Sequence, residues 1–243
     1  MSRSARRVDQ ASGYVLHQRP FRDTSLIVEL FARDYGRLTS FARGARGPKP
    51  RFFGLRPFLP LLLSWAGRGE APQLTAAEPR AAVPPLPPEN LLSGFYLNEL
   101  LMKLTGQHDP HPEVFDQYEQ ALQQLRTGSS PEPVLRRFER RLLELLGYGL
   151  ELTREAGSGR IVRADGYYRH EPGLGVVAVQ PGTAEALSGR VLLCLAVDEE
   201  CTDEGDQRAA RALMRGAVDH CLDGRPLATR AVARSLARME HRE

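Results

Sequence analysis

The sequence predicts an α+β protein in several parts: a small N-terminal β-barrel of five strands, followed by an α-helical bundle with a small β-containing insertion. Three observations predict this. Apolar residues up to about residue 80 alternate with a period of two, as they do in half-buried strands. Val83 to Pro88 holds four prolines in six residues, which favours a stiff extended connection. Beyond it, apolar residues recur at helical spacing.

Short apolar runs bounded by turn residues mark the five strands. Residues 1–12 are polar, so we expect them to be frayed. The strands are expected at 14–16, 26–31, 37–43, 59–65 and 72–77. A long segment, 44–56, separates the third strand from the fourth. Barrels of the oligonucleotide-binding (OB) kind carry an extra element at this place, so we favour an OB-fold over the SH3-like barrel that five strands also permit.

The third strand and the loop after it carry the strongest functional pattern. Leu38, Ser40 and Ala42 point to one face of this strand. The other face is cationic with one aromatic residue, and it holds Arg37, Thr39, Phe41 and Arg43. Phe41 is either a base-stacking residue or an inward core residue. Because a cationic strand face with an aromatic suits a sugar-phosphate backbone and unstacked bases, this face is a candidate site for single-stranded nucleic acid.

Helical periodicity begins after the proline-rich connection. Stripes of apolar residues predict amphipathic helices at 92–104, 114–125 and 135–146. Gly147 to Gly182 is rich in Gly and Tyr, with short β-like runs at 160–164 and 175–179, which predicts a hairpin. Further helices are expected at 184–197, 202–221 and 229–239. The expected parts are therefore a barrel at 1–82, a bundle at 83–149, a β-hairpin insertion at 150–182 and completing helices at 183–243.

Charge is distributed unevenly along the chain. Residues 1–80 carry 14 Lys and Arg against 6 Asp and Glu, whereas residues 81–243 carry 19 against 24. A basic front half indicates that contact with a polyanion belongs mainly to the barrel. Three sparse cysteines indicate a reducing compartment, and the longest apolar run, Pro57 to Ala66, is too short to span a bilayer. We therefore expect a soluble, cytoplasmic protein without a membrane partner.

Motifs of catalysis and cofactor binding are missing from the sequence. It contains no phosphate-binding loop, dinucleotide fingerprint, H-E-x-x-H or G-x-S-x-G. His108 and His111 flank Asp109 and Pro110, which favours a turn between helices over a metal site. The acidic cluster at 199–206 is typical of a helix start. Cys194 and Cys201 are too far apart for a zinc pair, so we expect a protein that is not an enzyme and has no metal or cofactor.

A second functional pattern lies on the third predicted helix. Arginines flank its apolar stripe, and together they are typical of a groove for an acidic peptide with an apolar end. The alternative is a helix surface on which arginine stems cover apolar edges. The candidate groove residues are Leu100, Leu104, Arg126, Arg136, Arg137, Phe138, Arg140 and Arg141.

Several stretches in order along the chain resemble one known family. They are 15–26, 36–38, 42–46, 57–63, 67–70, 96–101, 133–139, 145–149 and 224–227. With these residues, the chain resembles the bacterial RecO family of DNA-repair and recombination-mediator proteins. Many members of that family carry a four-cysteine zinc module after the Leu-Gly-Tyr-Gly motif. Residues 154–160 contain no cysteine here, so no zinc is expected.

The resemblance implies a DNA-binding mediator that is not an enzyme. It implies binding of single- and double-stranded DNA, annealing of complementary strands, and help in loading the RecA recombinase, with RecR and the single-stranded DNA-binding protein SSB as partners and association with the nucleoid. The acidic SSB tail ends in Pro-Phe and suits the arginine-flanked groove. The predicted DNA contacts are Arg19, Arg22, Arg37, Phe41, Arg43, Arg46, Lys49, Arg51, Arg56 and Arg68.

Three rival hypotheses remain. The chain is alternatively an adaptor whose main ligand is the SSB tail and whose barrel binds DNA weakly. An RNA-binding barrel protein is disfavoured by the resemblance. A nuclease would need carboxylates that line a cationic cleft, and the basic front half has no such cluster.

Overall fold

The computed structural model describes residues 6–46, 50–52, 54–67, 69 and 71–240. The chain divides into two compact units, which are described separately here. The first unit contains Met1–Ser129 and Leu227–Glu243, and the second contains Ser130–Pro226. The domain boundaries predicted at residues 82, 149 and 182 separate parts that would fold independently. The two units do not test these boundaries, which stay predictions.

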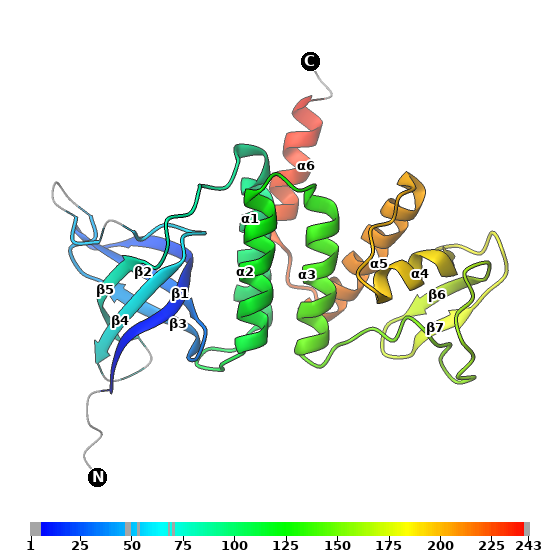
Figure 1. Cartoon of the computed structure of the whole chain (residues 1–243), viewed down its shortest axis with the longest axis horizontal. Helices are drawn as coiled ribbons and strands as arrows, with labels where there is room; N and C mark the ends of the chain where they lie inside the picture. Colours follow the sequence, from blue (N-terminus) through cyan, green and yellow to red (C-terminus); the bar gives the residue numbers. More distant parts are fainter. Residues whose placement is uncertain (1–5, 47–49, 53, 68, 70, 241–243) are drawn as a thin grey trace, which may run out of the picture. The chain divides into compact units, whose positions relative to one another are not determined.

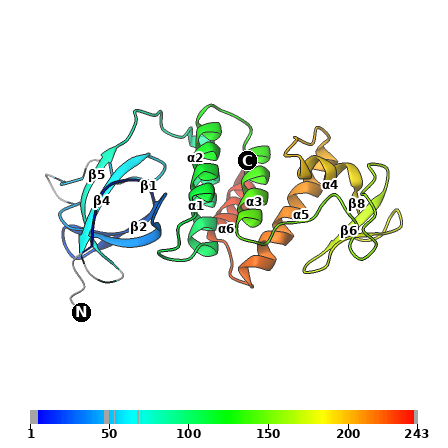
Figure 2. The same ribbon diagram turned by 60° about the horizontal axis from the view of Figure 1, so that its bottom comes forward.

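Five strands of the first unit close into a barrel (Figures 1 and 2). They are β1 (Arg6–Phe21), β2 (Ser25–Ala32), β3 (Gly36–Ala42), β4 (Leu61–Gly67) and β5 (Gln73–Pro79). Around the barrel the order is β1-β2-β3-β5-β4, and β3 pairs with β5 in parallel through Phe41 and Gln73. This closed arrangement of five strands confirms the predicted OB-fold.

The first strand is longer than the sequence pattern predicts. Residues 6–12, expected to be frayed, pair with β4 and contribute buried Val8 and Ala11 to the core. The register shifts between Val8 and Ala11 and again between Val15 and His17. Because each β-bulge interrupts the period of two, a simple alternation search misses this strand. Residues 1–5 lie outside the described residues.

The barrel interior is aliphatic and closely packed. Val15, Val28, Leu30, Leu61 and Leu63 are each fully buried. A Cβ added at Gly13 would lie 2.4 Å from a methyl carbon of Leu63, so the strand passes too close to its neighbour for a side chain. Trp65 is 5% exposed and belongs to this core.

Two helices pack on the outside of the barrel within the first unit. They are α1 (Leu91–Leu104), preceded by the 3₁₀ turn η1 (Pro88–Asn90), and α2 (Pro112–Arg126). Tyr14 of β1 and Phe31 of β2 are fully buried against Phe115 and Tyr118 of α2, with ring centroids 5.1–6.3 Å apart. The barrel and these helices therefore share a second apolar core.

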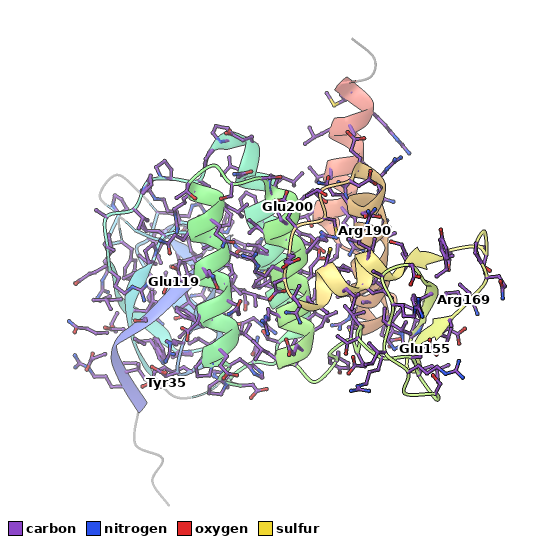
Figure 3. The ribbon with its side chains drawn as sticks, turned by 45° about the vertical axis from the view of Figure 1, so that its right-hand side comes forward. Tyr35, Glu119, Glu155, Arg169, Arg190 and Glu200 are labelled. Atoms are coloured by element: carbon purple, nitrogen blue, oxygen red, sulfur yellow. The ribbon has the colours of Figure 1, made fainter. Side chains whose placement is uncertain are left out.

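Polar contacts fix the same helices to the barrel. Asn98 donates to the carbonyl of Leu16 over 2.8 Å, and Tyr118 donates to Asn98 over 2.6 Å. Tyr14 donates to Glu119 over 2.6 Å, and Glu119 (labelled in Figure 3) also pairs with Arg80. Burial, then the Glu119 hydrogen bond, raises the pKa of Tyr14 well above its ordinary value.

The turn between α1 and α2 closes on the start of β3. His108 donates its backbone N–H to the Arg37 carbonyl over 2.7 Å. Gly36 has φ +70°, and a Cβ there would lie 2.2 Å from the Asp109 carbonyl oxygen. The predicted interhelical turn is confirmed, and His111 contacts Asp109 over 3.1 Å.

A C-terminal helix returns to the first unit. It is α6 (Ala228–Glu240). The Glu99 carboxylate of α1 accepts from the backbone N–H groups of Ala228 and Thr229 over 2.8 and 2.9 Å and from the Thr229 hydroxyl over 2.7 Å. Glu99 therefore holds the first turn of α6, since these N–H groups have no partner within the helix.

The second unit combines helices with a three-stranded sheet. Its helices are α3 (Pro131–Leu145), α4 (Gly189–Ala196) and α5 (Glu204–Leu222), and its strands are β6 (Tyr167–Glu171), β7 (Gly175–Ala178) and β8 (Leu187–Ser188). The sheet order is β7-β6-β8; β6 and β7 are labelled in Figure 1 and β8 in Figure 2. Together with the barrel, these elements confirm the predicted α+β class.

Two predicted elements of the second unit are displaced. The hairpin partner of β7 is β6, whereas residues 160–164 contribute only an isolated bridge between Ile161 and Arg154. The helix predicted from residue 184 begins at Gly189, because Leu187 and Ser188 pair with β6 and the Ser188 hydroxyl caps α4. At α5, Asp203 accepts from two backbone N–H groups, as expected of an acidic helix start.

Candidate nucleic-acid interface

In the described part of the chain, the outer face of β1, β2 and β3 has one end covered and one end open. At the covered end, Tyr14 and Phe31 lie under α2. Toward the other end, Arg19 of β1 and Phe41 of β3 flank Ile27 of β2 in register. The burial of β3 alternates strictly, with Leu38, Ser40 and Ala42 inside. The predicted outward face of this strand is therefore confirmed.

An aromatic pair occupies the open end. The rings of Phe21 and Phe41 lie 5.3 Å apart with planes inclined at 49°. Both side chains are half-buried, and neither belongs to the buried barrel core. With Ile27 between the strands they form the aromatic platform, defined here as Phe21, Ile27 and Phe41. Phe41 thus faces outward, and Phe21 is a partner that the sequence pattern missed.

Exposed arginines surround the aromatic platform. Arg22, at φ +54°, places its guanidinium carbon 5.2 Å from the Phe21 ring centroid. The Arg46 backbone N–H donates to the Thr24 carbonyl over 2.9 Å, so the turn after β1 and the turn after β3 are joined. The rim arginines, defined by their exposure at these strand ends, are Arg19, Arg22, Arg43 and Arg46.

Arg51 and Arg56 lie on the segment that leads to β4. The Arg51 guanidinium donates to the Thr75 carbonyl over 3.2 Å and lies 5.4 Å from the Phe52 ring centroid. Phe52 and Leu55 are buried in the barrel core, so the described part of this loop is anchored. Arg56 is exposed. Lys49 and Arg68, also predicted as DNA contacts, lie outside the described residues.

Arg37 is occupied by other groups. Its guanidinium lies 3.3 Å from the Glu29 carboxylate and donates to the Thr105 carbonyl over 3.2 Å. Glu29 also accepts from the Thr39 hydroxyl over 2.8 Å. The Arg37 side chain is only 15% exposed. Because its charge is compensated by Glu29 and its side chain is largely buried, we leave Arg37 out of the interface.

The predicted peptide groove divides between the two units. Leu100 is fully buried, and Arg126 donates to the Phe58 carbonyl, both in the first unit. In the second unit Phe138 is 2% exposed and Arg140 is 9% exposed. Leu100, Phe138 and Arg140 therefore serve packing in their own units. Leu104 is half-buried in α1.

The α3 arginines make a dense set of ion pairs. Arg136 pairs with the fully buried Glu139 over 2.7 Å. Arg140 and Arg141 converge on Asp198, over 2.7 and 2.9 Å. These pairs support the alternative that most of this arginine cluster is structural.

A small pocket of about 40 Å³ remains beside α3. Arg136 and Arg137 line it together with Leu195, Glu200 (labelled in Figure 3) and Cys201. Arg137 donates to the Asp198 carbonyl over 3.0 Å. Burial, then Cys194, raises the pKa of the Cys201 thiol to about 11, so this cysteine stays protonated. The pocket thus offers two arginines, an apolar wall and an acidic rim.

Within the described ranges, no group of three or more His, Cys, Asp and Glu residues is placed to hold a metal ion. The helices of the described part include none that is long and apolar enough to cross a membrane.

Two family models match consecutive parts of the chain. Residues 7–83 match the family model described as recombination protein O N terminal, and residues 87–228 match recombination protein O C terminal. A protein of Azoarcus sp. (strain BH72) named DNA repair protein RecO is 45% identical, over 95% of this chain and 97% of its own. Proteins of the same name from Alkalilimnicola ehrlichii and Methylococcus capsulatus are 47% and 43% identical, over 97% and 91% of this chain and 94% and 91% of theirs.

Proposed function

The chain belongs to the RecO family of DNA-repair proteins, and from this premise we propose that it is a DNA-binding recombination mediator. It binds single- and double-stranded DNA, anneals complementary strands, and acts with RecR to help load RecA onto SSB-coated DNA. It performs this role without catalysis and in association with the nucleoid. Membership of this family supports a role in DNA repair and recombination, and the individual steps are our proposal.

One observation carries the proposed DNA interface. The aromatic platform stands at the uncovered end of an OB-fold face, and the rim arginines Arg19, Arg22, Arg43 and Arg46 surround it. Arginines bind phosphates, and an aromatic ring offers a stacking surface to any base. Such a site holds a single strand by its backbone and by base faces without reading its sequence.

The same geometry supports strand annealing. Phosphate contacts carry no sequence information, so the base edges of a strand held at the rim remain available for pairing. A strand bound in this way can meet its complement while it is still on the protein. Duplex DNA is then held mainly by its phosphates.

The test reverses the charge of two rim arginines in the full chain. We expect Arg43→Glu with Arg46→Glu to weaken binding of a fluorescein-labelled oligothymidylate steeply. The slope of log affinity against log salt should fall by about 0.7 for each lost phosphate contact. Fluorescence anisotropy over a salt series measures both, and mixing of complementary labelled strands measures annealing.

The control is a second pair of charge reversals far from the proposed interface in the sequence. Arg208→Glu with Arg215→Glu changes the net charge equally, at exposed positions of α5. If this control lost as much affinity, binding would follow net charge alone. An affinity that did not depend on salt, or rim variants that bound normally, would overturn the interface.

The pocket beside α3 favours a second candidate function, recruitment through the SSB tail. Arg136 and Arg137 can pair with carboxylates of the tail, and Leu195 faces its apolar end. Arg136 is a poor choice for mutation because it neutralises buried Glu139. We therefore expect Arg137→Glu to weaken binding of a labelled SSB-tail peptide at least tenfold or so, with DNA binding retained.

The acidic rim of this pocket provides the opposite control. Glu200 is exposed beside the arginines and repels an acidic peptide. Glu200→Lys should therefore strengthen tail binding. If both substitutions left peptide binding unchanged, the tail would bind elsewhere and this pocket would be excluded.

A further inference from the structure

A separate apolar groove lies within the first unit, where the segment before β4, the proline-rich connection and the start of α1 meet. Its volume is about 260 Å³. Phe58 and Leu86 form its floor and are 8% and 6% exposed. A Cβ added at Gly94 would lie 2.7–2.9 Å from these two side chains. The floor is therefore closely packed and the hollow above it is preformed.

Large apolar side chains of α1 stand exposed at the edge of this groove. Phe95 is 44% exposed and Leu91 is 39% exposed. The Phe95 ring lies 5.0 Å from that of Phe58 in an edge-to-face arrangement. A contiguous exposed apolar patch with a polar rim often marks a site of interaction with another protein. The groove thus has an apolar surface well suited to burial by another molecule.

The charges around the groove have one sign. Arg56 and Arg126 are the charged residues among the described residues that line it. Arg56 is exposed. Arg126 donates to the Phe58 carbonyl, and its Nε is buried without a hydrogen-bond partner in the described part of the chain. Phe58 has φ +69°, a strained conformation that often marks a binding site.

We propose that this groove, termed the Phe95 groove, docks an extended segment of a partner protein in which an apolar side chain stands beside a carboxylate. The apolar side chain fills the hollow against Phe58 and Phe95. The carboxylate pairs with Arg56 at the rim. Aromatic and arginine side chains around a pocket are the usual anchors of protein interfaces. This inference goes beyond DNA binding and uses residues distinct from the pocket beside α3.

Two other occupants would leave different traces. A nucleotide base could stack on Phe95, in which case DNA affinity would depend on that residue. A second copy of the chain could cover the exposed side chains, in which case the mass in solution would depend on Phe95. The mostly aliphatic and prolyl lining favours a peptide over a base, since only Phe95 offers an exposed ring.

The experiment selects peptides for the groove with the full chain. A phage library of random short peptides is first depleted on a Phe95→Ser, Arg56→Glu double variant and then panned on the unaltered chain. Thermal unfolding confirms that the variant is folded, and Arg56→Glu alone replaces it if it is not. A parallel depletion uses Tyr148→Ser with Arg215→Glu, which removes an exposed aromatic and a cation in the second unit.

We expect peptides specific to the groove to share an aromatic or aliphatic residue beside Asp or Glu. A synthetic peptide of this kind should lose at least tenfold or so in affinity with Phe95→Ser or with Arg56→Glu, and bind normally to the Tyr148, Arg215 and Arg137→Glu variants. Failure to recover such peptides, or recovery of peptides without carboxylates, would overturn the proposal. The proposal would also be overturned if Phe95→Ser reduced the affinity for DNA, or if it reduced the molecular mass of the protein in solution by separating two copies of the chain.

Discussion

At the scale of single residues, the contact between Phe21 and Phe41 defines the candidate interface. Two aromatic rings that are half-buried against each other bring a rigid apolar surface to the end of a cationic strand face. Stacking on such a ring contributes roughly 1–3 kcal/mol per base. The rings are therefore expected to hold bases, while the rim arginines hold phosphates.

Phe41→Leu tests stacking with little change in packing. Leucine keeps an apolar side chain over Ile27 but has no ring face, so affinity for oligothymidylate should fall by roughly 1–3 kcal/mol while its salt slope stays unchanged. Anisotropy titrations measure both values. Tyr148→Leu, at a residue 56% exposed in the second unit, is the matched control. Equal affinity for the Phe41 variant and the unaltered chain would remove Phe41 from the interface.

His170 makes the stability of the chain depend on pH. Burial, followed by the nearby His220, lowers the pKa of His170 below its ordinary value of 6.5. Below pH 6.5 the unfolded chain therefore binds a proton that the folded chain resists. The contribution of neutral His170 to the free energy of unfolding should be fully present above pH 6.5. It should fall as the pH drops, with a slope of up to about 1.4 kcal/mol per pH unit for one proton.

His170→Gln should flatten this dependence, and urea unfolding between pH 5 and about 7.5 measures it. His220→Gln removes one of the two causes and should reduce the slope partly. His17→Gln changes an exposed histidine of β1 and serves as the control. A His170 variant with the same slope as the unaltered chain would contradict the assignment.

At the scale of elements, Gly36 joins β3 to the turn between α1 and α2. A side chain there would clash with the Asp109 backbone at 2.2 Å, in addition to the strain of φ +70°. Gly128 has a similar φ of +79° with nothing within 4 Å of an added Cβ. Comparison of the two glycines therefore separates the clash from the strain.

Gly36→Ala should lower the free energy of unfolding by several kcal/mol, whereas Gly128→Ala should cost about 1 kcal/mol. Chemical denaturation measures both values. Two variants of equal stability would show that the turn can move away from β3 without cost.

Elements with regular alternation were predictable from the sequence, and irregular ones were not. β3 alternates without interruption, so its outward face was predicted. β1 is interrupted by two register shifts, and β6 carries Arg169, His170 and Glu171, which do not look like a strand. Local sequence therefore favoured the more apolar segment 160–164 for the hairpin.

The candidate site was partly predictable for a related reason. The rim arginines are among the predicted DNA contacts because charge is visible in the sequence, and their role stays a prediction. Phe21 was missed because its partner Phe41 is distant in the chain. The compensation of Arg37 by Glu29 also depends on pairing between strands. Such pairings follow from the register of the sheet, which single residues do not reveal.

At the scale of the whole molecule, the barrel depends on helices that follow it. A fragment of residues 1–82 would expose Tyr14 and Phe31, which are at most 1% exposed in the chain. It would also leave Arg33 and Arg80 without the acidic partners that α2 supplies. The OB-fold here therefore has a surface that is complete only with α1 and α2.

We expect the fragment 1–82 to aggregate or unfold without a cooperative transition, and the fragment 1–129 to remain soluble and unfold cooperatively. Size-exclusion chromatography and thermal unfolding compare the two. A monomeric, cooperative fragment 1–82 would show that α1 and α2 are dispensable for the barrel.

The return of α6 to Glu99 has a consequence for synthesis. The ribosome makes the barrel, α1 and α2 first, then the whole second unit, and only then the helix that Glu99 holds. At bacterial rates of translation this interval is on the order of ten seconds. During that time α6 does not yet cover α1 in the nascent first unit. The Glu99 carboxylate is then exposed to other molecules near the ribosome. The first unit is therefore begun first during synthesis but is completed only after the second unit has been made.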